Sequence, residues 1–349
     1  MSLVDIKSMY LEEIERDFES LSIPKYKAKQ VFKWLSKGVE SFDEMTDLSI
    51  ALRNSLKEKY YIASVQIEKK LKSKYDETTK YLFKLNDGEL IESVLMKYKH
   101  GYSICVSTQI GCKMGCKFCA TGLSGFSRDL TASEILSQIQ KASADNDIRI
   151  SNIVLMGMGE PLDNYENVLR FLNIATSVEG INIGMRHISL STCGVVDKIY
   201  SLAEEKLQLT LSISLHAPND DIRNKLMPIN KRYNISELLL ACRAYIAKNN
   251  RRVSIEYAMI DKVNDSEDCA RQLAKLLKDM LCHVNLIPVN SIGTRKNKFE
   301  KSKKESIQKF IKVLKYNKIP VTVRRTLGSD ISASCGQLKR KGEKYENIC

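Results

Sequence analysis

The spacing of apolar residues changes twice along the chain. Up to about residue 60, apolar side chains recur every three or four positions, as at Leu11, Ile14, Phe18 and Leu21, which predicts helices. Residues 61–100 instead alternate apolar and polar positions around a turn at Asn86-Asp-Gly88, which predicts a β ribbon. From residue 101 onward, short apolar segments alternate with amphipathic helical stretches.

Six of these apolar segments are predicted strands: Ser103–Thr108, Asn152–Met158, His187–Thr192, Gln208–Leu215, Val253–Ile260 and His283–Val289. Helical patterns lie between them, as in Thr131–Ser143, Asn164–Ser177, Ile235–Lys248 and Ser266–Met280. Repeated strand–helix units predict a parallel sheet or barrel, and six units are fewer than the eight of a closed barrel. We therefore expect an α/β protein built on a partial (β/α)6 barrel with a wide mouth.

This pattern divides the chain into four expected regions. Residues 1–60 form a small helical domain, 61–100 a β ribbon or linker, 101–320 the partial barrel, and 321–349 a C-terminal segment with a polar, basic end. Lysines interleave with aromatic residues in the second predicted helix of the first region, at Lys25, Lys27, Lys29, Lys33 and Lys37. This pattern fits a nucleic-acid-binding surface and a solvated helix face equally well.

The positive charge is concentrated near the end of the chain. The 349 residues carry a formal charge of +13, and the stretch from Arg295 to Lys344 holds 16 Lys and Arg against 4 Asp and Glu, a net of +12. Lysine-rich helix faces are often only solvated, but such clustering is better explained by a polyanionic partner such as nucleic acid.

Composition also excludes several classes of protein. No apolar run approaches the roughly 20 residues of a membrane span, and the start of the chain does not resemble a secretory signal. Ten scattered cysteines do not form a disulfide framework. We therefore expect a cytoplasmic protein that makes no membrane contact.

The most informative motif is a C-x3-C-x2-C run formed by Cys112, Cys116 and Cys119. Three thiolates at this spacing can hold three irons of a cubane iron–sulfur cluster and leave the fourth iron without a protein ligand. A structural zinc site would need a further ligand, such as Cys105 or a histidine. Buried thiols without metal are a third reading. The spacing favours the cluster. An iron without a protein ligand can bind another molecule, which indicates a catalytic cluster.

Polar and small residues follow the predicted strands. These are Gly157-Met-Gly-Glu-Pro161, Ser189-Leu-Ser-Thr-Cys-Gly194, Ser214-Leu-His216 and Pro288-Val-Asn290. Because the carboxyl ends of parallel strands meet at one face of a barrel, these groups are expected to gather around a polar cofactor.

The cysteine run, with Phe118 before its last Cys, and Met156-Gly-Met-Gly-Glu-Pro161 together resemble the radical S-adenosylmethionine (SAM) superfamily. The chain further resembles the RlmN-like RNA adenine-C2 methyltransferases, a family within it. The motifs that carry this resemblance are Tyr26–Trp34, Ser41–Thr46, Cys105–Cys112, Ser214–Asn219, Leu226–Asn230, His283–Pro288 and Gly328–Leu338. They cover nearly the whole chain.

The resemblance implies a set of site residues. Cys112, Cys116 and Cys119 would hold one [4Fe-4S] cluster per chain, with SAM on its open iron. Gly159, Glu160, Ser191, Ser214, Leu215, His216 and Asn290 would line the SAM site, where Glu160 suits the SAM amino group. Cys335 would carry the methyl group, with Arg324, Arg325 and Lys339 nearby to favour its thiolate. Cys105 would be its partner thiol, and Glu92 a proton acceptor.

The resemblance also implies a two-stage reaction. One SAM methylates Cys335, and a second is cleaved to a 5′-deoxyadenosyl radical that takes a hydrogen from the S-methyl group. The resulting carbon radical adds to adenine C2, a base removes the C2 proton, and Cys105 attacks the Cys335 sulfur to leave a disulfide. Whether Glu92 or Cys105 takes the proton stays open. The implied partners are 23S rRNA, a tRNA with an adenine on the 3′ side of its anticodon, and an electron donor such as flavodoxin or ferredoxin; a monomer is expected.

Three other readings remain beside this one. A Cfr-like branch of the family methylates adenine C8, confers antibiotic resistance and shares the cluster and both thiols; the N-terminal motifs and Leu90-Ile-Glu-Ser-Val94 favour C2. An iron–sulfur RNA-binding protein or redox sensor without enzyme activity would leave Gly157-Met-Gly-Glu160 unexplained. A radical SAM enzyme acting on a small molecule would leave the positive charge unexplained.

Overall fold

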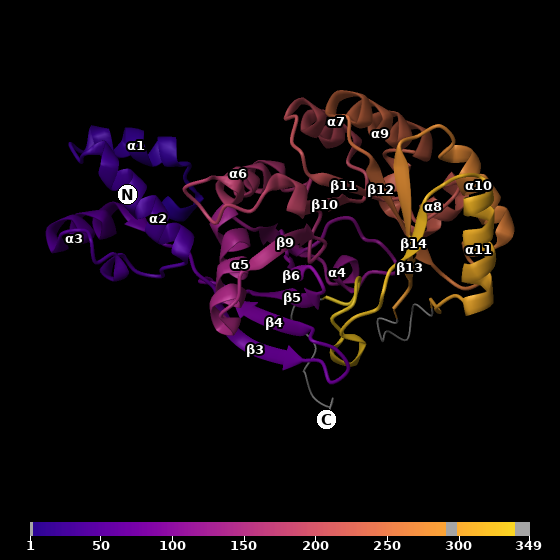
Figure 1. The fold of residues 1–349 in the computed structure, drawn as a ribbon, viewed down its shortest axis with the longest axis horizontal. Helices are drawn as coiled ribbons and strands as arrows, with labels where there is room; N and C mark the ends of the chain where they lie inside the picture. Colours follow the sequence, from indigo (N-terminus) through magenta and orange to yellow (C-terminus); the bar gives the residue numbers. More distant parts are fainter. Residues whose placement is uncertain (1–2, 291–298, 339–349) are drawn as a thin grey trace.

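The computed structural model describes residues 3–290 and 299–338, and a ten-stranded sheet forms its centre (Figure 1). In order across the sheet, the strands are β14 (Val321–Val323), β13 (Cys282–Pro288), β12 (Val253–Met259), β11 (Thr210–Ser214), β10 (Ile188–Thr192), β9 (Ile150–Leu155), β6 (Gly101–Cys105), β5 (Leu90–Tyr98), β4 (Thr79–Lys84) and β3 (Gln66–Lys72). The strands from β14 to β6 are parallel to one another, and β5, β4 and β3 are antiparallel. Among the described residues, the two end strands β14 and β3 do not pair.

The predicted partial barrel is confirmed, with additions. All six predicted strands occur, and β14 follows them as a further parallel strand. This strand has only three residues, too few to show an alternation of apolar and polar positions in the sequence. The predicted ribbon, with its turn at Gly88, continues the sheet of the barrel through the pairing of β5 with β6. A second small sheet, β7 (Gln109–Gly111) with β8 (Phe126–Asp129), brackets the cysteine loop.

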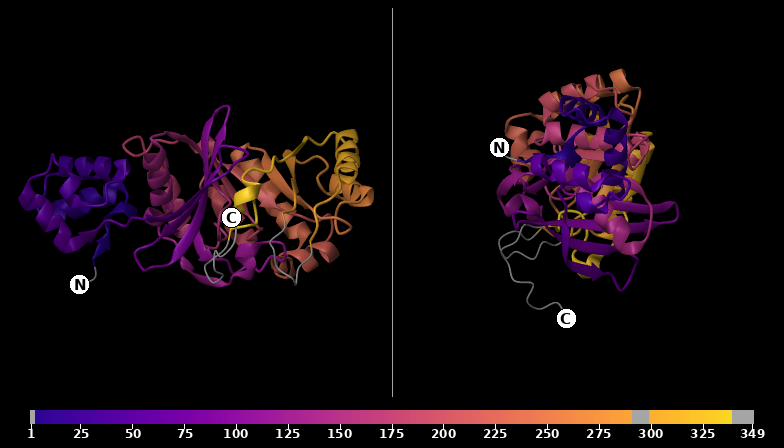
Figure 2. Two further views of the ribbon diagram at one scale, coloured as in Figure 1. Left: turned by 90° about the horizontal axis from the view of Figure 1, so that it is seen from below. Right: turned by 90° about the vertical axis from the view of Figure 1, so that its left-hand side faces the viewer.

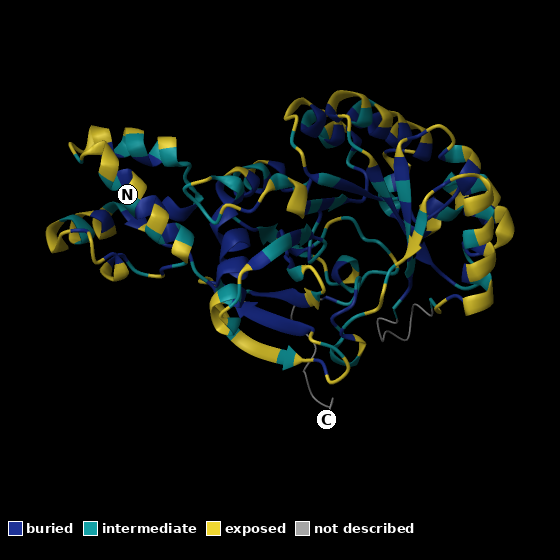
Figure 3. Cartoon of the chain, viewed as in Figure 1, coloured by how far each residue is buried: buried dark blue, intermediate teal, exposed yellow. Residues whose placement is uncertain are grey.

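Helices cover the convex face of the sheet, and their exposed positions point outward (Figures 1 and 3). They are α5 (Ala132–Asn146), α6 (Tyr165–Thr176), α7 (Val196–Glu204), α8 (Asp220–Leu226), α9 (Ile235–Asn249), α10 (Glu267–Leu276) and α11 (Lys304–Tyr316), with the short α4 (Ala120–Leu123) beside the cysteine loop. Single 3-10 turns lie at Ile6–Ser8, Phe42–Glu44, Met185–His187, Pro228–Lys231 and Ser329–Ile331. The caps follow the sequence, since Thr131 and Asn234 each accept a backbone N–H of the first turn of their helix.

The parallel strands present two different faces. On β9 and β10, Ile153, Leu155 and Leu190 are buried beneath the helices. The alternate positions, such as Asn152 and Ser189, are only partly buried and face the concave side. This period of two puts the hydrophobic core under the helices and polar groups inside the barrel.

The N-terminal helices stand at one end of the long axis of the molecule (Figure 2). This part contains α1 (Leu11–Ser20), α2 (Lys25–Lys37) and α3 (Ile50–Lys59), and closes where β1 (Val4–Asp5) pairs with β2 (Tyr60–Tyr61). Buried Lys7 donates to the Ser137 hydroxyl on α5 at 2.8 Å and to the Ala63 carbonyl at 3.3 Å. We propose a domain boundary near residue 60, as the change in apolar spacing indicates.

Parts of the predicted basic segment lie outside the described residues, including Arg295 and Lys339. Among the helices that the structure does describe, none is both long enough and apolar enough to cross a membrane.

Candidate active site

A pocket lies at the carboxyl ends of the parallel strands, where the sequence predicts it. We call it the strand-end pocket. Its lining includes Cys112, Cys116, Phe118, Cys119, Met156, Gly159, Glu160, Ser191, Ser214, His216, Glu256, Asn290, Arg324 and Cys335. Six of the seven residues expected at the SAM site therefore line one pocket. Leu215, the seventh, is fully buried behind it.

Two glycines let the loop after β9 pack directly on the segment that follows β6. A Cβ on Gly157 would come within 2.5 Å of the Val106 carbonyl oxygen. Gly159 has φ +103°, and a Cβ there would come within 2.6 Å of the Gln109 side chain. Glycine is required at both positions, by close approach and, at Gly159, by the positive φ. The two glycines of the Gly-Met-Gly motif therefore allow the main chain of this loop to lie in direct contact with Val106 and Gln109.

Glu160 is held by main-chain donors. One carboxylate oxygen accepts the Cys193 N–H at 2.7 Å and the other accepts the Leu162 N–H at 3.0 Å. Burial raises the pKa of Glu160, although these hydrogen bonds oppose the shift. A fixed carboxylate in a pocket wall suits a cationic amino group.

His216 is a buried, neutral imidazole. Burial lowers its pKa to about 3. Its Nδ1 accepts the Ala258 N–H at 2.9 Å, so the ring proton is on Nε2 and that nitrogen is a donor. The ring meets Phe118 edge-on, with centroids 5.0 Å apart. The aromatic residue between two cysteines of the motif therefore packs against a wall of the same pocket.

The cysteine loop fits an iron–sulfur cluster. Cys112, Cys116 and Cys119 all line the strand-end pocket, and burial raises the pKa of each, to about 12 for Cys112. Such thiols become thiolates only beside a strong cation, which bound iron supplies. Among the described residues, no three His, Cys, Asp or Glu side chains are gathered as ligands of a single ion. Cys105, which could have been the further ligand of a zinc site, does not line this pocket.

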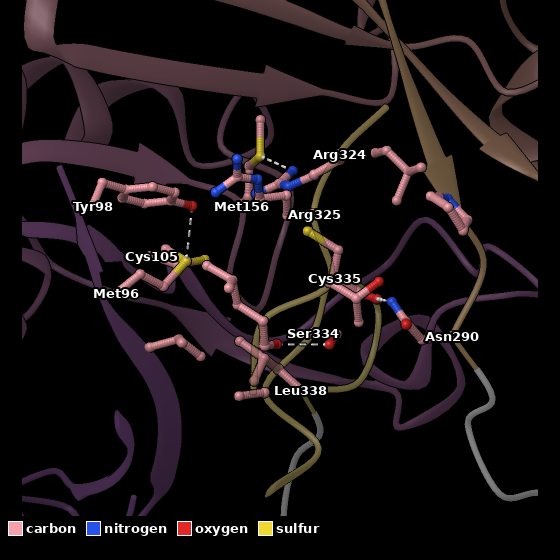
Figure 4. Close-up of a pocket in the computed structure, with 16 residues that line it drawn as sticks. Met96, Tyr98, Cys105, Met156, Asn290, Arg324, Arg325, Ser334, Cys335 and Leu338 are labelled. Atoms are coloured by element: carbon pink, nitrogen blue, oxygen red, sulfur yellow. Dashed lines mark hydrogen bonds between the residues drawn. The ribbon is translucent and has the colours of Figure 1, made fainter. Parts of the chain in front are cut away.

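A second pocket adjoins the first, and we call it the two-cysteine pocket. Cys105 at the end of β6 and Cys335 in the C-terminal segment both point into it (Figure 4). Its other walls include Val94, Met96, Tyr98, Met156, Asn290, Arg324, Arg325 and Leu338. Cys335 belongs to both pockets, and Asn290 donates to its carbonyl oxygen at 3.3 Å. Cys335 therefore belongs to the wall that the two pockets share.

The two thiols have different surroundings. Burial, and then the nearby sulfur of Cys335, raises the pKa of Cys105 to about 12, so Cys105 is a neutral thiol. Arg324 lies in the walls of both pockets and donates to the Met156 sulfur at 3.3 Å. Arg324 and Cys335 line both pockets together, and electrostatic interaction with Cys335 is the first cause of a raised pKa of Arg324.

Hydrogen bonds from the β3–β4 hairpin hold the C-terminal segment in place. Asp330 accepts from the Ser73 hydroxyl and the Lys74 N–H, both at 2.8 Å. Asp76 accepts the Gly328 N–H at 3.0 Å. On the other side of Cys335, α4 supports the segment through Ala120 N–H to the Gly336 carbonyl at 2.8 Å and Thr121 to the Leu338 carbonyl.

Glu92 lies beside the two-cysteine pocket without lining it. It is fully buried on β5 and pairs with Lys80 at 2.8 Å. Lys80 also donates to the Ser332 carbonyl at 3.1 Å. The predicted proton acceptor is thus connected to the Cys335 segment through one lysine.

Sequence reasoning missed Lys80, Glu256 and Tyr98. A lysine within a strand is usually exposed, and the other two carry no motif. The alternation along β5 could have placed Tyr98 on the same face as Glu92.

The comparisons with known proteins agree with this geometry. Residues 106–274 match the Radical SAM superfamily, and residues 4–62 match the ribosomal RNA large subunit methyltransferase N-terminal domain. The chain belongs to the RlmN family of radical SAM RNA methyltransferases. A probable dual-specificity RNA methyltransferase RlmN of Clostridium novyi is 51% identical, with 96% of this chain and 98% of that protein covered. The corresponding protein of Alkaliphilus oremlandii is 52% identical, with 98% and 99% covered.

A solved structure shares the whole architecture. The crystal structure of a radical SAM methyltransferase from Sphaerobacter thermophilus superposes with a TM-score of 0.91 at 43% identity, covering 96% of this chain and 99% of that one. Membership of the family makes this protein an RNA methyltransferase, and its relatives do not favour the Cfr-like alternative.

Proposed function

We propose that this enzyme methylates C2 of an adenine in 23S rRNA, and of the adenine on the 3′ side of a tRNA anticodon, through S-methyl-Cys335. The observation that carries the proposal is the position of Cys335 in the walls of both pockets. A sulfur at that place can receive a group in the strand-end pocket and deliver it in the two-cysteine pocket.

The strand-end pocket is the proposed site of the cluster and SAM. Cys112, Cys116 and Cys119 would hold a [4Fe-4S] cluster, and Gly159, Glu160, Ser191, Ser214, His216 and Asn290 would contact SAM, with Leu215 supporting them from behind. When bound, the cluster and SAM supply one-electron reduction and a hydrogen-abstracting radical, with an electron donor such as flavodoxin or ferredoxin. The residues of the chain position these groups and exclude water.

The two-cysteine pocket is the proposed site of the target adenine. Met96 and Tyr98 offer surfaces on which a purine can lie. Arg324 lines both pockets together with Cys335, so a positive charge lies near the sulfur that would take up the first methyl group. Cys105 lines the same pocket, where its attack on the Cys335 sulfur would release the product and form a disulfide.

Glu92 is the better candidate for accepting the C2 proton. Cys105 is a neutral thiol at physiological pH, so it cannot take a proton before it loses its own. Glu92 is a carboxylate in an ion pair and lies on the β5 face that also presents Val94 and Tyr98.

The first experiment removes the methyl carrier. Cys335→Ala protein, reconstituted without oxygen and given SAM, reductant and an RNA stem-loop, should form 5′-deoxyadenosine but no methylated RNA. Cys269→Ala, at a buried cysteine on α10 outside both pockets, is the control. Methylated RNA from the Cys335→Ala enzyme would disprove the proposed route.

The second experiment removes the partner thiol. Cys105→Ala should accumulate a covalent adduct between Cys335 and RNA, seen as a slower band on a denaturing gel. Free product released at the normal rate would contradict the role of Cys105. Mass spectrometry of the wild-type product distinguishes 2-methyladenosine from 8-methyladenosine, and only the first agrees with the proposal.

A further inference from the structure

The inside of the partial barrel contains a third pocket, next to the two-cysteine pocket, and we call it the lumen groove. It lies on the concave face of β9, β10 and β11 and is lined by residues that include His100, Asn152, Arg186, His187, Ser189 and Arg324. Met96 and Tyr98 line both this groove and the two-cysteine pocket, so the two spaces are neighbours.

The lining of the lumen groove mixes polar and apolar side chains, whereas the interior of a closed barrel is apolar throughout. Closed barrels fill their interior with branched apolar side chains. Here Asn152, Ser189 and Thr210 occupy the inward positions of three adjacent strands and remain partly accessible. An accessible row of amide and hydroxyl groups suits a polar ligand.

The lumen groove is also positive. No Asp or Glu is among its lining residues, whereas Arg186 and Arg324 are. Arg186 is exposed and makes no ion pair within the described part of the chain. His187 is exposed beside it, and its Nδ1 lies 3.0 Å from the Asn152 amide oxygen, which ties the ring to the strand.

One edge of the lumen groove carries a pair of stacked rings. Tyr98 and His100 have centroids 5.3 Å apart and planes inclined by only 11°. His100 is exposed, so the outer face of its ring is available to a further flat group. Single-stranded RNA is commonly bound by aromatic stacking together with cationic contacts to phosphate.

We propose that the lumen groove binds the nucleotides flanking the target adenine, with Arg186 on a phosphate and His100 stacked on a base. The inference rests on the proposed function, because it takes the two-cysteine pocket as the adenine site. The Tyr98 side chain, shared by both spaces, then lies between the target base and its neighbour. This specifies an unpaired RNA strand as the substrate at this site.

The test measures equilibrium binding of an RNA stem-loop, without oxygen, over a series of salt concentrations. Arg186→Gln should weaken binding and lower the slope of log affinity against log salt by about 0.7, the loss of one phosphate contact on a single strand. His100→Ala should weaken binding about tenfold, as the loss of one stacked base does, with little change in slope. Arg271→Gln, an exposed arginine on α10, is the matched control and should change neither quantity.

A second readout separates this inference from the proposed function. Methylation of Cys335 by SAM needs no RNA under the proposal, so all three variants should methylate Cys335 at the wild-type rate. Wild-type affinity and slope in Arg186→Gln and His100→Ala would overturn the groove assignment, as would a parallel loss of Cys335 methylation, which indicates structural damage. Failure of the wild-type enzyme to methylate Cys335 would instead count against the proposed function.

Discussion

The two adjoining pockets are built in different ways. The strand-end pocket is shaped by main chain, because glycines, strand ends and backbone amides set the positions of Gly159, Glu160 and His216. The two-cysteine pocket is closed by a segment whose hairpin side is held by side-chain bonds of Lys80 and Asp330. Residues fixed by the main chain of strands and tight loops resist displacement, whereas a hydrogen bond from a side chain can break and form again without a change in the fold. The comparison indicates that the proposed cofactor site is rigid and that the proposed substrate site beside it is adjustable.

The largest effect is expected at Lys80. Lys80→Met removes the cation that Glu92 pairs with in a buried setting, which typically costs about 3–5 kcal/mol. It also releases the Ser332 carbonyl, so Cys335 should react faster with a maleimide. Urea unfolding and alkylation mass spectrometry measure the two effects. Lys84→Met, at an exposed lysine of the same strand, should change neither; an unchanged alkylation rate in Lys80→Met would contradict the anchoring role.

Gly159→Ala should break the strand-end pocket. The positive φ costs about 1–2 kcal/mol for a residue with a Cβ, and the overlap with Gln109 adds a packing penalty of about 1–3 kcal/mol. SAM affinity, measured by calorimetry, should fall more than tenfold. Gly88→Ala shares the positive φ but meets no atom within 4 Å, so it isolates the backbone cost. Equal losses of stability in the two variants would refute the close-packing argument.

The pH dependence of stability should reflect His216. Its pKa is lowered to about 3, so between about pH 6.5 and 3 the unfolded chain binds a proton that the folded protein does not. Stability from this residue is complete above pH 6.5 and is lost as the pH falls, by up to about 1.4 kcal/mol per unit. Unfolding free energies of wild type and His216→Asn at pH 6 and 5 should show the difference; parallel curves would exclude it.

The smallest effect on stability is expected at Asp330. Asp330→Ala loses the contacts to Ser73 and Lys74 on the surface of the hairpin. Cys335 alkylation should rise several-fold while the unfolding midpoint stays close to wild type. Asp221→Ala, at an exposed aspartate on α8, is the control. A loss of SAM affinity in Asp330→Ala would show that the two pockets are not independent.

The sequence predicted well the six strands and the strand-end pocket, which depend on main-chain geometry. Alternation and turn residues gave the six strands, and the positions after them gave the residues of the strand-end pocket. The anchors were not predictable, because Lys80 and Ser332 are 252 positions apart and neither has a distinctive neighbourhood. For the same reason the sequence did not indicate that Glu92 is buried and paired with Lys80. The lysines of α2 remain compatible with RNA binding or simple solvation, since Lys29, Lys33 and Lys37 are all exposed.

The place of Cys335 in a shared wall has a consequence for timing. Under the proposed function, a methyl group bound to this residue in the strand-end pocket is also within reach of the two-cysteine pocket, so no segment of the chain has to move between the two. The cofactor and the nucleic acid could then occupy their proposed pockets at the same time.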